Sequence, residues 1–229
     1  MQLAKPRFDV GLAVADAAAT LAFWQDEIGL KLDHVLPIGN GLHQHRHELL
    51  GSVLKVNVTR DGHPQRSASG YRELLIAREG LAAPRALADP EGNRVMLVPS
   101  GHRGVTRIGM VIGVRDLAAH RAFYETALGL PSRDGASDNF LCGDSIVFLE
   151  PDAGAPADAA LDGLGYRYLT IQVASCDTEH AGIVARGGRE GRPAITLGDV
   201  ARFSFVRDPD GNWIEISQRK SLTGSLAPG

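Results

Sequence analysis

The chain repeats itself at an offset of 100 residues, and this repeat constrains the fold more than any other feature. The segment from Asp9 to Leu30 (DVGLAVADAAATLAFWQDEIGL) aligns without a gap on Gly109 to Leu130 (GMVIGVRDLAAHRAFYETALGL). Each copy closes with the same turn, Asp-Pro-acid-Gly-Asn, which begins at Asp89 or Asp208 and runs into an apolar segment. The chain therefore contains one structural unit made at least twice.

Each repeat begins with a pattern typical of a strand followed by a helix. Val10, Leu12 and Val14 alternate with other residues, as in a strand with one apolar face. Asp16 and its counterpart Asp116 stand where an N-cap carboxylate begins a helix, and Gly29 and Gly129 stand where that helix ends. Three short strands, 30–38, 42–50 and 52–58, complete a βαβββ unit in the first copy.

The second copy contains a further unit of the same type. It has a strand at 168–175, a helix at 179–186 preceded by Asp177, and strands around 194–196, 203–205 and 213–217. In the first copy only strands at 72–77 and 94–98 are evident. From Asp16 to the closing turn is 73 residues (16 to 89), against 92 from Asp116 (116 to 208), so we expect the first copy to lack a helix and a strand.

Composition excludes several classes of protein. With 44% apolar and 22% charged residues among 229, the chain can bury a core, which excludes a disordered chain. A net charge of -3 offers no basic surface for nucleic acid or an anionic membrane, so a small molecule is the expected partner. No apolar stretch approaches a membrane span or a signal segment, and two cysteines are too few for a disulfide scaffold, so we expect a cytoplasmic protein.

These motifs resemble the vicinal oxygen chelate superfamily, which includes glyoxalase I, bleomycin resistance proteins and extradiol dioxygenases. The resemblance extends from Phe8 to Gln218 and implies an α+β fold of βαβββ units, paired around a cup-shaped sheet that holds the ligand. It predicts two tandem modules, 1–100 with a shortened second half and 105–219, followed by a flexible tail, 220–229. The half-modules pair either sequentially or first with last. Only the second arrangement brings Asp9 and Glu215 into one cup.

Metal-dependent members of this superfamily place one ligand on the first and one on the last strand of each half-module. Strand parity carries these positions onto Asp9, Lys55, Glu73 and Met96 in the N-terminal module. In the C-terminal module they fall on Gly109, Phe148, Thr170 and Glu215, and the assignment of Glu73 is uncertain by one residue. Few of these are usual metal ligands, so the resemblance does not extend to an iron site of two histidines and a carboxylate.

Lys55 and Glu215 are the two positions from which we predict specific roles. Leu54 and Val56 face the helices, so Lys55 faces the cup, where we expect it to replace the metal by pairing with Asp9, Glu73 or both. Glu215 is the candidate catalytic residue, as a general base or as an acceptor for a ligand hydroxyl. An inert carboxylate is an equal alternative.

His43, His45 and His47 share one face of a strand. Alternate residues lie about 6.6 Å apart along a strand, so one metal ion cannot bind all three, but two of them with another residue form a possible site. The alternative is a polar wall of the cup or a solvated edge, and we include His45 and His47 among the candidate ligand-binding residues. The other five histidines are expected on loops or exposed helix faces.

Three aromatic residues, Phe203, Phe205 and Trp213, alternate in strands near the second cup. A binding role and a core role are equally compatible with that pattern. Phe205 and Trp213 complete the predicted ligand-binding set, whose other members are Asp9, His45, His47, Lys55, Glu73, Met96, Phe148 and Thr170.

The sequence supports three functions. The first is a small-molecule-binding member of the superfamily without the usual metal site, either a sequestering protein or a metal-independent enzyme. The second is a metal-dependent lyase, isomerase or dioxygenase with an atypical divalent-metal site at His43, His45 and His47. The third is a degenerate, non-catalytic interaction protein. We also predict a homodimer, because the shortened module would leave apolar sheet or a strand edge uncovered.

Overall fold

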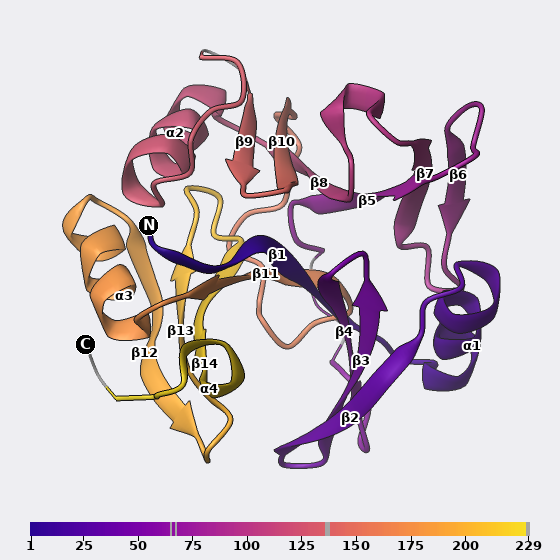
Figure 1. Cartoon of the computed structure of the whole chain (residues 1–229), viewed down its shortest axis with the longest axis horizontal. Coiled ribbons are helices and arrows are strands. Elements are labelled where there is room, and N and C mark those ends of the chain that lie inside the picture. The colour runs from indigo at the N-terminus through magenta and orange to yellow at the C-terminus, as the bar shows by residue number, and fades with distance from the viewer. Residues whose placement is uncertain (65, 67, 136–137, 228–229) are drawn as a thin grey trace.

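The computed structural model describes residues 1–229 except 65, 67, 136–137 and 228–229, and these residues form two sheets (Figure 1). The larger sheet has the strand order β12-β13-β14-β11-β1-β4-β3-β2, and the smaller has β6-β7-β5-β8-β10-β9. The strands of the larger sheet are β1 (Leu3–Ala13), β2 (Leu32–Gly39), β3 (Leu42–Leu49), β4 (Ser52–Thr59), β11 (Gly165–Val173), β12 (Arg189–Leu197), β13 (Ala201–Arg207) and β14 (Trp213–Arg219). Those of the smaller sheet are β5 (Tyr71–Arg78), β6 (Arg85–Ala88), β7 (Arg94–Pro99), β8 (Ile108–Val114), β9 (Asn139–Cys142) and β10 (Ser145–Pro151).

The first unit of the chain pairs with the last, and the second pairs with the third. β1 lies between β4, to which it is parallel, and β11, to which it is antiparallel, with Asp9 opposite Thr170. In the smaller sheet β5 is antiparallel to β8. The segments 1–100 and 105–219 therefore describe the repeat along the chain but not the two sheets, each of which takes strands from both segments.

The helices begin and end where the repeat predicts. Asp16 caps α1 (Ala17–Ala22) and Asp116 caps α2 (Leu117–Ala122), each accepting a hydrogen bond from the backbone N–H three residues later. Each helix continues as a π-helical segment: α1 as η1 (Phe23–Glu27) and α2 as η3 (Phe123–Ala127). The chain then turns at Gly29 or Gly129, with φ of 78° and 77°.

The last unit differs from its prediction at the start of its helix. α3 (Cys176–Ala185) is capped by Ser175, whose hydroxyl accepts from the N–H of Thr178, so Asp177 lies in the first turn and not before it. The predicted tail begins with a short helix, α4 (Lys220–Thr223), and residues 228–229 of that tail lie outside the described residues.

The second unit is shortened as its length predicts. It contains β5, β6 and β7, with none of its described residues in a helix, so it lacks the helix and one strand of a complete βαβββ unit. The third unit keeps its helix, but a single bridge between Ser132 and Phe140 is found at its second strand position.

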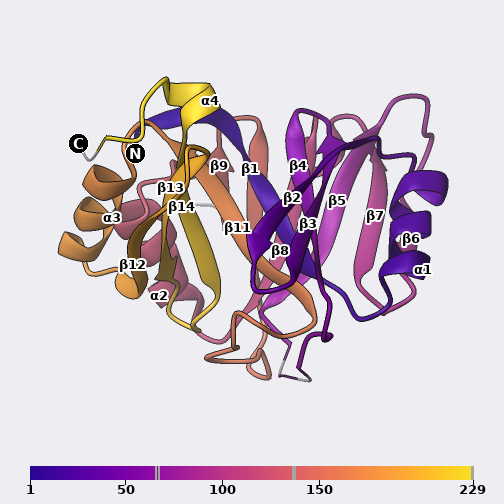
Figure 2. The same cartoon turned by 90° about the horizontal axis from the view of Figure 1, so that it is seen from below.

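One core joins the two sheets. Val10 and Leu54 of the larger sheet pack with Leu74 and Met110 of the smaller sheet in a single buried cluster. β1 contacts β9 and β10, and β11 contacts β5. In Figure 2 α1 covers one end of the assembly, while α2 and α3 cover the other. The face of the larger sheet that does not pack into this core forms the cup.

Candidate ligand-binding cup

A cavity of about 670 Å³ occupies the concave face of the larger sheet. Its floor is polar and includes Gln44, Lys55 and Glu215, whereas its walls are largely apolar. The apolar lining residues include Leu36, Ile38, Leu42, Leu161, Pro193, Ile195, Leu197, Phe203 and Phe205. This size and lining are typical of a site for a small organic molecule.

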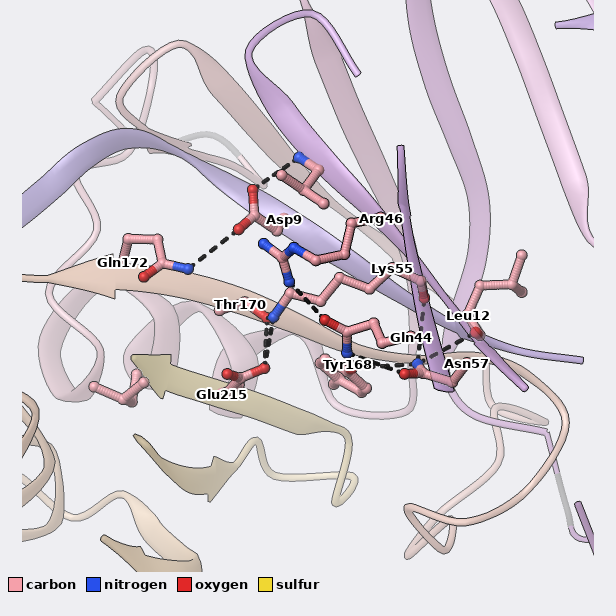
Figure 3. Close-up of polar contacts among 12 residues, drawn as sticks. Asp9, Leu12, Gln44, Arg46, Lys55, Asn57, Tyr168, Thr170, Gln172 and Glu215 are labelled. Atoms are coloured by element: carbon pink, nitrogen blue, oxygen red, sulfur yellow. Dashed lines mark hydrogen bonds and ion pairs between the residues drawn. The ribbon is translucent and has the colours of Figure 1, made fainter. Parts of the chain in front are cut away.

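Four residues at the predicted ligand positions meet at the floor: Asp9 on β1, Lys55 on β4, Thr170 on β11 and Glu215 on β14 (Figure 3). The Lys55 Nζ lies 2.8 Å from Glu215 Oε2 and 2.6 Å from Thr170 Oγ1. The Thr170 hydroxyl donates to the same Glu215 oxygen at 2.7 Å. The ammonium, the hydroxyl and one carboxylate oxygen therefore form a closed triangle of hydrogen bonds.

Lys55 pairs with a carboxylate, as predicted, but not with the carboxylate that we expected. Asp9 is paired with Lys5 instead, at 2.6 Å, and accepts further hydrogen bonds from the N–H of Val53 and from Gln172. Glu73 lies in the other sheet. Burial lowers the pKa of Lys55, an effect that the Glu215 charge opposes.

Asp9 and Thr170 do not line the cavity, whereas Lys55 and Glu215 do. Within the described residues, Glu215 accepts two side-chain hydrogen bonds, both at Oε2, and no protein donor is found for Oε1. Glu215 therefore presents one oxygen to the cavity.

A second group of polar residues lies beside the triangle. The Tyr168 hydroxyl accepts hydrogen bonds from Gln44 at 3.3 Å and from Asn57 at 3.2 Å. The Gln44 side chain also donates to Asn57 Oδ1 at 3.1 Å and accepts from Arg46 at 2.5 Å. Burial raises the pKa of Tyr168, so this phenol remains protonated at neutral pH. We did not identify Gln44, Arg46, Asn57, Tyr168 or Gln172 from the sequence.

The histidines of β3 point away from the cup, so the prediction that His45 and His47 bind the ligand is wrong. In the β3–β4 hairpin Arg46 is opposite Lys55 and His47 is opposite Leu54, and opposed residues share a face of the sheet. His47 is buried on the core side and contacts Gln25 at 3.1 Å. Burial lowers the pKa of His47. The metal site proposed at His43, His45 and His47 therefore has no place in the cup.

A turn in the sequence contains the signal that would have placed this strand correctly. Leu50 and Gly51, with φ of 52° and 82°, form a two-residue connection between the paired residues Leu49 and Ser52. Such a tight connection determines the register of the whole hairpin. Because Lys55 faces the cup, that register also turns Arg46 toward the cup.

The two aromatic predictions have different outcomes. Phe205 is opposite Glu215 and lines the cavity, as does Phe203. Trp213 is not among the lining residues: its ring contacts Phe205 and lies 4.6 Å from the Arg207 guanidinium, and its indole N–H donates to the carbonyl of Ala159 at 2.7 Å. Trp213 therefore anchors the 151–165 loop.

The equivalent face of the smaller sheet is filled by the chain itself. Phe148, at a predicted ligand position, is 1% exposed and packs with Leu75, Val105 and Met96. A Cβ atom on Gly109 would lie only 2.6 Å from the Phe148 ring. The predictions that Met96 and Phe148 bind a ligand are therefore wrong, because apolar packing occupies this space.

The prediction for Glu73 is wrong by two residues: Leu75 occupies the strand position in the smaller sheet that corresponds to the floor positions of the larger sheet. Leu75, not Glu73, is in register with both Gly109 and Met96. Glu73 instead pairs with Arg94 of the neighbouring strand β7, at 2.8 Å, in the smaller sheet. Glu73 therefore has no part in the cup.

The floor residues do not fit a divalent metal. The four positions supply two carboxylates, one hydroxyl and one ammonium, and the ammonium already bonds the Glu215 oxygen that a metal would need. A cation bound there would displace Lys55 or lie beside its positive charge. Within the described residues, no cluster of three or more histidine, cysteine, aspartate or glutamate side chains is arranged to hold a metal ion.

Comparison with known proteins places this architecture. Residues 107–216 match the family model of the Glyoxalase/Bleomycin resistance protein/Dioxygenase superfamily, in agreement with the resemblance seen in the sequence. No curated protein matches the chain by sequence. Among the residues described, every helix is too short or too polar to cross a membrane.

Solved structures extend the match to the whole fold. Glyoxalase I from Zea mays superimposes with a TM-score of 0.70 and 16% identity, over 94% of this chain and 95% of the maize chain. A variant of the same maize enzyme superimposes with a TM-score of 0.74 and 14% identity, over 99% of this chain and 96% of the variant's chain. A candidate dioxygenase from Bacillus subtilis superimposes with a TM-score of 0.66 and 12% identity, over 100% of this chain and 92% of the Bacillus chain. At these identities the likeness establishes the fold alone: an α+β arrangement of βαβββ-type units shared with these proteins.

Proposed function

We propose that the protein binds a small organic molecule in the cup of the larger sheet, with the Lys55–Glu215 ion pair in the place that a divalent metal takes in other members of the superfamily. The observation that carries this proposal is the 670 Å³ cavity whose floor holds a closed lysine, threonine and glutamate triangle. Apolar walls supply contact area, and the floor supplies orientation.

Glu215 is the polar group that we expect to contact the ligand most directly. Its Oε2 atom is occupied by Lys55 and Thr170, whereas Oε1 is available to accept a hydrogen bond from a ligand hydroxyl. The same oxygen is positioned to accept a proton, as the general base of a metal-independent lyase would; an oxidoreductase would need an electron acceptor as well. Binding comes first in the proposal, and catalysis by Glu215 depends on it.

A thermal-shift screen of small metabolites tests binding. A ligand at 100 times its dissociation constant adds about 2.7 kcal/mol to the stability of the folded protein. The matched control is Ser217→Phe, which places a ring in the cavity beside Glu215 on the same strand. Hits that stabilise the wild type but not Ser217→Phe support the cup as the site, and a screen without such hits contradicts the proposal.

The metal content of protein purified without chelators tests the second part. We expect no stoichiometric divalent ion at the cup. A stoichiometric ion that is lost in Glu215→Gln, but retained in a variant of an acid elsewhere such as Glu73→Gln, would contradict a role for Lys55 in place of the metal.

The homodimer and the location in the cell remain part of this proposal. Two edge strands of the larger sheet, β2 and β12, expose apolar side chains, with Leu32 44% and Ile195 55% exposed. Sedimentation at micromolar concentration is expected to show a dimer, and a single species near 24 kDa would contradict it. Both cysteines are free thiols, which suits the reducing cytoplasm.

A further inference from the structure

Two cations at the floor of the cup lack a counterion. The Lys55 charge is matched by Glu215, and the Asp9 charge by Lys5. Arg46 on β3 and Arg219 at the end of β14 also line the cavity. Within the described part of the chain, neither guanidinium forms an ion pair with a carboxylate. The four cations named here exceed the two carboxylates paired with them, so the floor carries an excess of positive charge.

Arg46 is the more constrained of the two. It is 4% exposed, so its guanidinium is almost entirely removed from bulk water. Its Nη1 donates to Gln44, but its buried Nε has no hydrogen-bond partner among the described residues. Figure 3 shows its side chain beside Gln44 and above the Lys55 and Glu215 side chains. Burying a cation with unmet donors is costly, and a bound anion would remove that cost.

Arg219 lines the same cavity as Arg46. Burial is the largest cause that lowers the pKa of Arg219, and the Arg46 charge lowers it further, whereas the charges of Asp9, Glu215 and Asp33 act in the opposite direction. Glu215 and Ser217 separate Arg219 from the start of β14 and share its face of the strand. The side chains of Glu215, Ser217 and Arg219 therefore all face the cavity.

The remaining walls define the rest of the molecule. Phe203 and Phe205 on β13 form an edge-to-face pair, with ring centroids 6.1 Å apart. Leu36 and Ile38 on β2 and Leu197 on β12 line the cavity as well. These surfaces suit an apolar or aromatic body, and the Glu215 carboxylate disfavours a second negative charge on the head group.

We propose that the ligand of the cup is an amphipathic monoanion, an organic acid whose single negative group binds between Arg46 and Arg219 while its apolar body lies against Phe203 and Phe205. This inference rests on the proposed function and specifies its ligand class. Guanidinium groups suit it because they bind a planar acid group through paired N–H donors. The Lys55–Glu215 pair then limits how deeply the acid enters.

Two fluorescent probes that share an aromatic body test the charge requirement. 8-Anilinonaphthalene-1-sulfonate carries one negative charge, and N-phenyl-1-naphthylamine is its neutral counterpart. We expect Arg46→Met and Arg219→Met each to weaken binding of the anionic probe by about tenfold or more, the value of one charge-assisted contact, and to change binding of the neutral probe by less than about twofold. Arg85→Met, an exposed arginine on the smaller sheet, is the matched control.

The outcomes separate the two proposals. If both probes bind the wild type and the arginine variants alter neither, the charge requirement is wrong while the cup remains a binding site. If neither probe binds, or Ser217→Phe leaves both unaffected, the cup is not the binding site and both proposals fail. Arg46→Met removes an unpaired buried charge, so it is expected to fold, and Arg219→Met gives an independent measurement if it does not.

Discussion

The ammonium of Lys55 is bound to two neighbours that are themselves bound to each other. Glu215 and Thr170 contact it at 2.8 Å and 2.6 Å, and the Lys55 side chain is only 4% exposed. A buried charge that keeps its partner is tolerated, whereas one that loses its partner is strongly unfavourable. The floor of the cup is thus a site where one substitution has a large effect on stability.

Lys55→Met is predicted to lower the free energy of unfolding by about 3 kcal/mol, because it leaves the Glu215 carboxylate buried with Thr170 alone. Urea denaturation of the variant and the wild type measures the change. The double variant Lys55→Met with Glu215→Gln is the control, and it should recover part of the loss because the Glu215 charge that lost its partner is also removed. Equal midpoints for Lys55→Met and the wild type would show that the pair does not stabilise the fold.

His120 is the residue whose surroundings differ most from the sequence expectation. It was expected on an exposed helix face, but its side chain is fully buried on α2 and lies 3.6 Å from both Asp208 and Asp210 of the closing turn. Burial alone would lower the pKa of His120, but Asp208, the carbonyl of Asp116 and Asp210 together raise it. The protonated form is therefore favoured in the folded protein.

This raised pKa predicts a dependence of stability on pH. Protonated His120 stabilises the fold fully below about pH 6.5, its unfolded pKa, and this contribution disappears as the pH rises through the folded pKa. His120→Gln should therefore cost about 1.5 kcal/mol or more near pH 6 and less near pH 9. Denaturant unfolding at the two pH values measures the difference, and a cost independent of pH would contradict the assignment.

The residues at the cup could be predicted where a single strand determines their direction. Alternation within β4 and β14 places Lys55 and Glu215 correctly, because apolar neighbours identify the opposite face. Alternation alone failed for β3, where polar residues occupy both faces and His47 is buried away from the cup. The partner of Lys55 was missed for another reason: the separation of Lys55 from Glu215 depends on which units pair, and the repeat allows two arrangements.

At the scale of elements, the repeat predicts where the helices of each unit begin and end, but not how the units pack against one another. Both N-caps and both glycine ends were correctly placed in α1 and α2, because capping depends on a few adjacent residues. The filling of the smaller sheet's face was not predicted, because it depends on contacts between β10 and the segment that includes η2 (His102–Gly104). The Arg103 guanidinium lies 4.3 Å from the centre of the Phe148 ring.

Phe148→Ala is predicted to destabilise the protein by about 3–5 kcal/mol, because it would open a cavity under η2 that the surrounding strands cannot close. Phe148→Leu, which keeps most of the apolar volume, should cost about 1.5 kcal/mol or less. Thermal and denaturant unfolding of the two variants gives the comparison. Equal costs would indicate that the ring is not tightly packed.

At the scale of the whole molecule, the pairing of first with last units makes the two repeats interdependent. β1 and β4 lie directly beside β11 and β14 in one sheet, although more than 100 residues separate β4 from β11. The core also joins both sheets. The two repeats therefore do not form two independent domains.

Fragments 1–104 and 105–229 are accordingly predicted not to fold cooperatively when they are separate. Each fragment lacks the strands that hydrogen-bond to its own: β1 loses β11, and β5 loses β8. An equimolar mixture should regain part of the cooperative denaturant transition of the intact chain, measured by circular dichroism. A full cooperative transition in fragment 105–229 alone would show that it is a domain in its own right.

The arrangement of the floor also has a consequence for synthesis in the cell. Lys55 and Arg46 leave the ribosome well before their neighbours on β14, Glu215 and Arg219, so the cup cannot form on a partly synthesised chain. Until β11 and β14 arrive, β1 has an open edge, which a nascent chain must keep from pairing with other strands. A ligand can therefore stabilise only a fully translated molecule, and cellular ligand would protect finished protein from degradation without assisting its early folding.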